Sequence, residues 1–142
     1  ITKKLVEISH QEDLSVNVWT VNKEYDMLKM VEYGVDGIMI GRAAIGYPWF
    51  FREVKHYFAT GEHLAPPSFE ERLEVIKQHL HASIKWKGPK LGIFEMRRHY
   101  SNYFKGIPHF KETRMQLVTE MDPTALIEIL GSIKTSYDEV TL

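Results

Sequence analysis

The chain has 142 residues, no cysteine and a formal net charge of −1. Without cysteine it has no disulfide framework and no thiolate metal site, and it lacks the run of about 18 apolar residues that could cross a membrane. Its hydrophobic content of 44% is enough for a buried core. At this length we expect about one domain, located in the cytoplasm. The first residue is Ile1 rather than methionine, as expected of a fragment or a processed chain.

Residues 1–35 alternate between helical and strand patterns. Residues 2–12 predict a helix that turns Leu5, Val6 and Ile8 inward. Apolar and polar residues then alternate over 15–20, which is typical of a strand. We expect a second helix over 23–33. It would begin at Asn22 as the N-cap, end at Gly34 and bury an apolar stripe. The members of that stripe are Met27, Leu28, Met30 and Val31.

Residues 36–51, DGIMIGRAAIGYPWFF, are the most informative stretch of the chain. Residues 36–40 predict a short buried strand, and Pro48 stands where a following helix could begin. We expect the turn at Gly41 and Arg42 to have free backbone N–H groups. A strand that ends in such a turn before a helix can bind a phosphate.

This stretch resembles the last strand and turn of the flavin-dependent tRNA-dihydrouridine synthases. In that family the strand closes a (β/α)8 barrel, and the backbone at the positions of Gly41 and Arg42 holds the phosphate of FMN. Residues 97–108, RRHYSNYFKGIP, resemble the signature of the same family's C-terminal helical domain, which grips tRNA. The two motifs together cover about residues 36–137. The resemblance implies an enzyme that reduces uridine in tRNA with FMN and a nicotinamide reductant.

The beginning of the chain resembles another family. The synthases carry an Asn-Gly-Asp-Ile type strand end ahead of the final helix, whereas residues 15–22 read SVNVWTVN. Residues 1–40 are similar instead to the C-terminal end of glycerophosphodiester phosphodiesterases, which are also (β/α)8 barrels. Two alternatives stay open here: a chimera or fusion joined near Met39, and a divergent synthase whose penultimate strand has drifted.

A complete barrel needs about 250 residues, so this chain can hold only part of one. We therefore expect an α/β fragment, the last two βα units of a TIM barrel, over residues 1–60. A linker at 61–67 and an all-α bundle at 68–142 would follow, giving a mostly helical chain. The catalytic strands and the cysteine general acid of the synthases are missing, so the chain alone should be inactive and bind no FMN. A diesterase fragment and a structural chain without activity remain alternatives.

The bundle is predicted from its helix caps and its apolar periodicity. Ser68 and Glu71 form a capping-box pattern, Gly88 and Pro89 interrupt the following helix, and Asp122-Pro123 begins the last one. We expect four helices, near 68–86, 91–105, 110–119 and 123–137. Three apolar stripes should form the core: Leu73, Ile76, Leu80 and Ile84; Ile93, Met96, Tyr100, Tyr103 and Phe104; Leu126, Leu130, Ile133 and Tyr137.

Positive charge is concentrated in one part of the bundle. Residues 85–114 contain eight Lys or Arg and two Glu, a net charge of +6 against −7 for the rest of the chain. At about 100° per residue, one face of the second helix is rich in donors, and guanidinium groups suit phosphates. We expect weak tRNA binding there, through Arg97, Arg98, His99 and Lys105. A solvated basic face without a partner is the alternative.

Two further expectations concern ligands and assembly. The seven histidines show no spacing typical of a metal site, so no metal and no catalytic residue is predicted. Two parallel strands would leave open edges with unpaired backbone groups, which can template association. We therefore expect a homo-oligomer that pairs through its strand edges, and no membrane partner.

Overall fold

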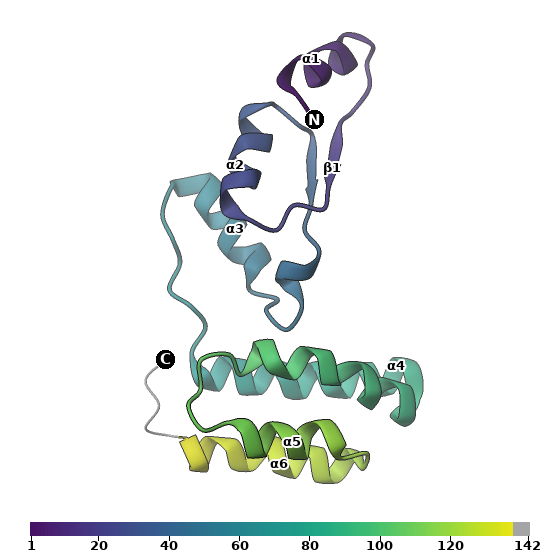
Figure 1. The fold of residues 1–142 in the computed structure, drawn as a ribbon, viewed down its shortest axis with the longest axis vertical. Helices are drawn as coiled ribbons and strands as arrows, with labels where there is room; N and C mark the ends of the chain where they lie inside the picture. The colour runs from purple at the N-terminus through teal and green to yellow at the C-terminus, as the bar shows by residue number, and fades with distance from the viewer. Residues whose placement is uncertain (138–142) are drawn as a thin grey trace. The chain divides into compact units, whose positions relative to one another are not determined.

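The computed structural model describes residues 1–137 and forms two compact units, Ile1–Ile45 and the helical unit that starts at Gly46 (Figure 1). The first unit contains five elements: α1 (Lys3–Gln11), β1 (Asn17–Trp19), α2 (Glu24–Glu32), β2 (Gly37–Met39) and the 3₁₀ turn η1 (Arg42–Ala44). The helical unit contains four: α3 (Phe50–Thr60), α4 (Phe69–Tyr103), α5 (Lys111–Thr119) and α6 (Pro123–Tyr137). The described part of the chain is mostly helical, as expected.

The first unit is a β-α-β arrangement. β1 and β2 pair in parallel with Val18 opposite Ile38, and α2 connects them. Gly34 follows α2 with a φ of +78°, which confirms the predicted helix end. A parallel pair joined by a helix is the repeating unit of barrels and of open sheets alike. The barrel origin of this unit is therefore still a proposal.

Both helices of the first unit bury fewer side chains than their sequence patterns predict. In α1 only Val6 is buried, whereas Leu5 and Ile8 are exposed. In α2 the buried residues are Met27 and Met30, while Leu28 and Val31 are exposed. A sheet of two strands covers only a narrow line on each helix, so the flanks of each apolar stripe stay in contact with solvent.

α4 is a hairpin of two helical segments. Gly88 interrupts it with φ +78° and ψ 165°, a conformation open mainly to glycine, and Pro89 follows. The predicted break is therefore confirmed. Figure 1 shows the two segments running side by side. The Ser83 hydroxyl donates to the Gly92 carbonyl, and a Cβ on Gly92 would lie 2.7 Å from the Ser83 carbonyl oxygen.

The predicted caps and core of the bundle are largely confirmed. The Ser68 hydroxyl accepts from the Glu71 N–H at 3.2 Å, and the Asp122 carboxylate accepts from the Ala125 N–H at 2.8 Å. α4, α5 and α6 pack against one another. The fully or nearly buried side chains include those of three expected stripes, with Ile84 and Tyr137 packed against the core: Leu73, Ile76, Leu80, Ile93, Met96, Tyr100, Tyr103, Phe104, Leu126, Leu130 and Ile133.

α3 groups with the bundle, so the division of the chain differs from the one expected at residues 61–67. Residues 61–68 are irregular as predicted, but the two units divide between Ile45 and Gly46. The reason is Trp49, just before α3. Its indole N–H donates to the Glu71 carboxylate at 2.6 Å and its ring meets the Tyr103 ring edge-on. Glu71 therefore contacts Trp49 instead of completing the capping box.

Candidate phosphate turn and candidate RNA-binding face

The turn after β2 is already bridged by a side chain. The Asn22 amide oxygen accepts from the Gly41 N–H at 3.3 Å and from the Ala43 N–H at 3.0 Å. Two corrections follow. Asn22 is not the N-cap of α2, since Lys23 holds that position without a side-chain cap. The Gly41 N–H is not free as the sequence suggested, because it donates to Asn22 together with the Ala43 N–H.

As it stands, this turn does not fit the phosphate of FMN. The Asn22 oxygen occupies the acceptor position that a phosphate oxygen would need at Gly41 and Ala43, and the donors of this turn that do not bond to it are those of Arg42, whose side chain is exposed. Gly41 has a packing role instead, because a Cβ there would lie 2.6 Å from a methyl carbon of Thr20. One exposed arginine beside an occupied pair of amides is a weak anion site.

The second segment of α4 has one buried face and one exposed face, as the helical periodicity of its sequence predicts. Arg98, Ser101 and Lys105 are exposed, whereas Tyr100 and Tyr103 are buried. The four residues expected to bind RNA therefore do not form one uniform set. Arg98 and Lys105 are free to reach solvent, while Arg97 and His99 are partly buried.

Arg97 is partly engaged within the unit. Its guanidinium carbon lies 5.2 Å from the centre of the Phe94 ring, a cation–π distance. One of its terminal nitrogens donates to the Met121 sulfur at 3.1 Å. Its Nε is buried and has no hydrogen-bond partner among the described residues. Arg97 therefore stands at the border between the exposed face of α4 and the loop that precedes α6.

His99 lies against the first segment of α4. Its ring meets the His79 ring edge-on at 4.6 Å, and its Nε2 accepts from the Arg98 Nε at 3.3 Å. Burial, with smaller effects from His79 and Arg98, lowers the pKa of His99 to about 4. Burial also lowers the pKa of His79, whose Nδ1 lies 3.2 Å from the Tyr103 hydroxyl. Near neutral pH His99 is therefore uncharged, and it adds no positive charge to the RNA-binding face.

We expect the helical unit to lose stability as the pH falls from about 6.5 to about 4. In that window the unfolded chain binds a proton at His99 that the folded unit does not, so stability rises with pH there. Protonation would also prevent Nε2 from accepting the Arg98 hydrogen bond. Urea denaturation at several pH values measures the effect, and His99→Gln should flatten the profile. An unchanged profile in His99→Gln would assign the acid loss to another group, such as His79, whose pKa burial also lowers.

The structure adds two cations that the sequence did not single out as site residues. Lys111 and Arg114 of α5, with Ser101 of α4, line a pocket of about 280 Å³. Its apolar wall consists of Phe104, Ile107 and Phe110. Both cations belong to the positively charged stretch 85–114, so the charge count was the available signal. Only the packing of α5 on α4 shows that they lie beside Ser101, on the exposed side of α4.

Residues 1–137 contain neither a cluster suited to a metal ion nor a helix that could span a membrane. No group of three or more His, Asp or Glu in that range is arranged to hold a metal ion. Within the same range no helix combines the length and the apolar character needed to cross a membrane.

Comparisons with known proteins account for nearly the whole chain. The family model of the dihydrouridine synthases matches residues 16–136. A probable tRNA-dihydrouridine synthase of Rickettsia conorii is 36% identical over 106 residues, which are 75% of this chain and 32% of the relative. The tRNA-dihydrouridine synthase B of Pseudomonas putida is 44% identical over 81 residues, 57% of this chain and 24% of the relative. A probable tRNA-dihydrouridine synthase 1 of Synechocystis is 37% identical over 86 residues, which are 61% of this chain and 24% of the relative.

The extent of these matches bears on the beginning of the chain. The family match starts at residue 16 and so includes β1 and α2, the segment that resembles the diesterases. The comparisons therefore give no support to a junction near Met39. The chain spans about a third or less of the length of these curated relatives. On the family match and these identities, the chain belongs to the dihydrouridine synthase family.

Proposed function

We propose that this chain is the C-terminal region of an FMN-dependent tRNA-dihydrouridine synthase, and that its helical bundle binds tRNA through the exposed side of α4 and α5. The observation that carries the proposal is the exposure of Arg98, Lys105, Lys111 and Arg114, together with the pocket that brings Lys111 and Arg114 beside Ser101 of α4. The relatives' names support tRNA as the partner. In the whole protein the reaction would be reduction of uridine in tRNA, and a cytoplasmic location is part of the same proposal.

The contacts to RNA would be mainly to phosphates. Exposed guanidinium and ammonium groups neutralise phosphates and position the nucleic acid, and they carry no sequence information. Arg98 lies on α4, Lys111 and Arg114 lie on α5, and Lys105 follows the end of α4. Because α4 and α5 pack on each other, the core beneath these residues fixes their arrangement. This arrangement supports weak binding with little sequence preference.

Salt dependence tests the proposed face. If about four phosphates are neutralised, the logarithm of the affinity for single-stranded or loop RNA should fall with log salt with a slope of roughly −3. Arg98→Ala should reduce that slope by about 0.7. Lys134→Ala removes the same charge from the exposed surface of α6 and serves as the control. Titration with unfractionated tRNA at low salt measures both, and no binding below about 100 μM would contradict the proposal.

We also propose that this chain alone holds no FMN and reduces no uridine. The support is the turn after β2, where Asn22 pairs two of the amides that a phosphate would need. The purified chain should therefore show no flavin absorbance, and adding FMN with tRNA and a nicotinamide reductant should produce no dihydrouridine. A yellow preparation with stoichiometric flavin would overturn this proposal.

Association through the first unit is a further part of the proposal. Among residues 1–137, β1 and β2 form a sheet of two strands, and their side chains Trp19 and Met39 are exposed. Open strand edges favour pairing with another chain. We propose a homo-oligomer, and light scattering that reports a strictly monomeric chain would count against it.

A further inference from the structure

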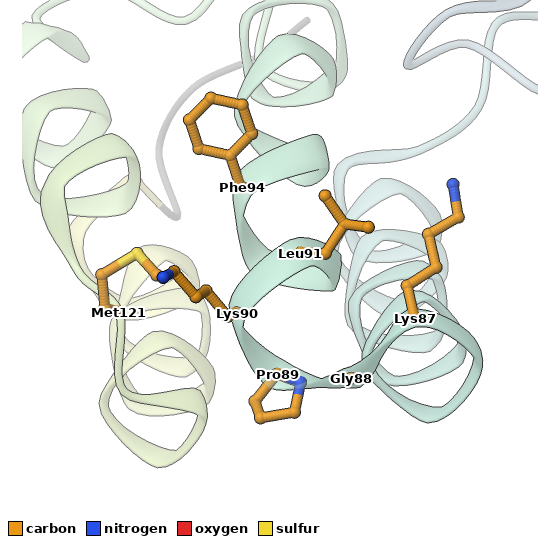
Figure 2. A pocket seen from close by; sticks show the side chains of 7 residues that line it. All are labelled: Lys87, Gly88, Pro89, Lys90, Leu91, Phe94 and Met121. Carbon is orange, nitrogen blue, oxygen red and sulfur yellow. The ribbon is translucent and has the colours of Figure 1, made fainter.

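A second pocket lies beside the turn between the two segments of α4. It has a volume of about 390 Å³, and Figure 2 shows the side chains that line it. Its apolar lining comes from Leu91 and Phe94 of α4 and from Met121 in the loop before α6. These side chains are 50%, 60% and 41% exposed, so none of them is buried in the core and all three can contact a ligand. The volume is within the range of small-ligand sites.

Cations border this apolar surface. Lys90 lines the pocket and forms no ion pair among the described residues. The Arg97 guanidinium lies against the Phe94 ring and the Met121 sulfur. Lys87, across the turn in Figure 2, is paired with Glu95 and lies over the Trp86 ring. Lys90 is therefore the lining cation that is open to an anionic ligand, and Arg97 borders the pocket through its contacts with Phe94 and Met121.

We propose that this pocket holds one unstacked nucleobase of single-stranded or loop RNA, with the base against Phe94 and its phosphate near Lys90 and Arg97. The inference rests on the proposed RNA-binding function and specifies what kind of RNA the bundle prefers. An exposed aromatic ring beside cations is the combination that single-stranded nucleic acid uses, since every base offers a flat face and every nucleotide a phosphate. The Arg97 guanidinium offers a second flat surface for stacking.

Two other occupants fit the surface less well. A second copy of this chain docking through the same pocket would bring Lys90 and Arg97 against their own equivalents, and like charges at an interface are unfavourable. An apolar peptide would fill the floor formed by Leu91, Phe94 and Met121, but it would leave Lys90 without an anionic partner. A nucleotide complements both surfaces, because its base fits the apolar floor and its phosphate fits the cations Lys90 and Arg97.

The test compares two RNA probes and a set of Phe94 variants in the 142-residue chain. The probes are a fluorescently labelled single-stranded RNA of about eight nucleotides and the same backbone with abasic riboses. Phe94→Ala should weaken binding of the first probe by roughly 5- to 150-fold and leave the second unchanged. Phe94→Trp should restore binding, whereas Phe94→Leu should not. Met115→Ala, on α5 with 54% exposure, is the matched control.

The salt slope separates this inference from the proposed function. Phe94 carries no charge, so its loss should lower affinity at every salt concentration without changing the slope. If the wild-type chain binds both probes with the expected slope and Phe94→Ala changes neither, the nucleobase pocket is wrong and the basic face stands. If the wild-type chain binds neither probe, both proposals fail. If Phe94→Ala instead changes only the molecular mass in light scattering, the pocket is a protein contact and the inference is overturned.

Discussion

Replacing Tyr100 with alanine is expected to lower the free energy of unfolding of the helical unit by about 3–5 kcal/mol. Tyr100 is fully buried in the second segment of α4, within the cluster that joins α4, α5 and α6. Truncation removes a large aromatic side chain from close-packed neighbours and leaves a cavity that the helices can close only in part. The basic residues of the same segment lie on its other face and are unchanged.

Tyr100→Phe tests the contribution of the hydroxyl to stability separately from that of the ring. The Tyr100 hydroxyl is buried with no hydrogen-bond partner among the described residues, and burial raises its pKa to about 12. Removing an unpaired buried hydroxyl should be neutral or stabilising by about 1–3 kcal/mol. Urea denaturation followed by tryptophan fluorescence suits this test. Trp49, in the helical unit, is 6% exposed, whereas Trp19 and Trp86 are 78% and 80% exposed. A large loss in Tyr100→Phe would mean that the hydroxyl has a partner in solution.

Gly46→Ala is expected to destabilise the helical unit by about 2–5 kcal/mol. Gly46 has a φ of +67°, in the left-handed region, and a Cβ there would lie 2.5 Å from the His99 carbonyl oxygen and 2.8 Å from the Asn102 Cβ. Both the backbone strain and the clash with α4 oppose a side chain. The turn before α3 would have to move away from the helix that carries the proposed RNA-binding face.

Gly61→Ala is the matched control for this prediction. Gly61 has a similar φ of +75°, but a Cβ there meets nothing within 4 Å. It should therefore cost only the left-handed strain, about 1–2 kcal/mol. The difference between the two variants in urea denaturation isolates the close approach of Gly46 to α4. Equal losses would show that the turn can move away from α4 at no cost.

Much of the fold follows from local sequence patterns. The caps at Ser68 and Asp122, the break at Gly88 and the buried faces of the bundle helices were predictable, because each depends on backbone preferences or on periodicity within one segment. The expected exposure of Arg98 and Lys105 also holds. The family resemblance of the stretch at 36–51 came from the same kind of local reading.

The expectations that failed depended on residues distant in sequence. Asn22 was read as a local cap, but its amide oxygen accepts from a turn about twenty positions further along. The sequence predicts inward-facing apolar stripes on α1 and α2, but the described first unit has only two strands to cover them. Whether a capping residue or an apolar face finds another partner is decided by packing, which the local pattern does not contain.

The sequence by itself therefore determined the helices of the bundle, the βαβ order of the first unit and the basic stretch from 85 to 114. Only the tertiary structure decided which side chains of different segments contact one another. It paired Trp49 with Glu71 and so joined α3 to the bundle. It placed His99 against His79 as a neutral ring, and it brought Lys111 and Arg114 beside Ser101. Hydrogen bonds, desolvation and pocket shape all depend on neighbours in space, whereas caps and periodicity depend on neighbours along the chain.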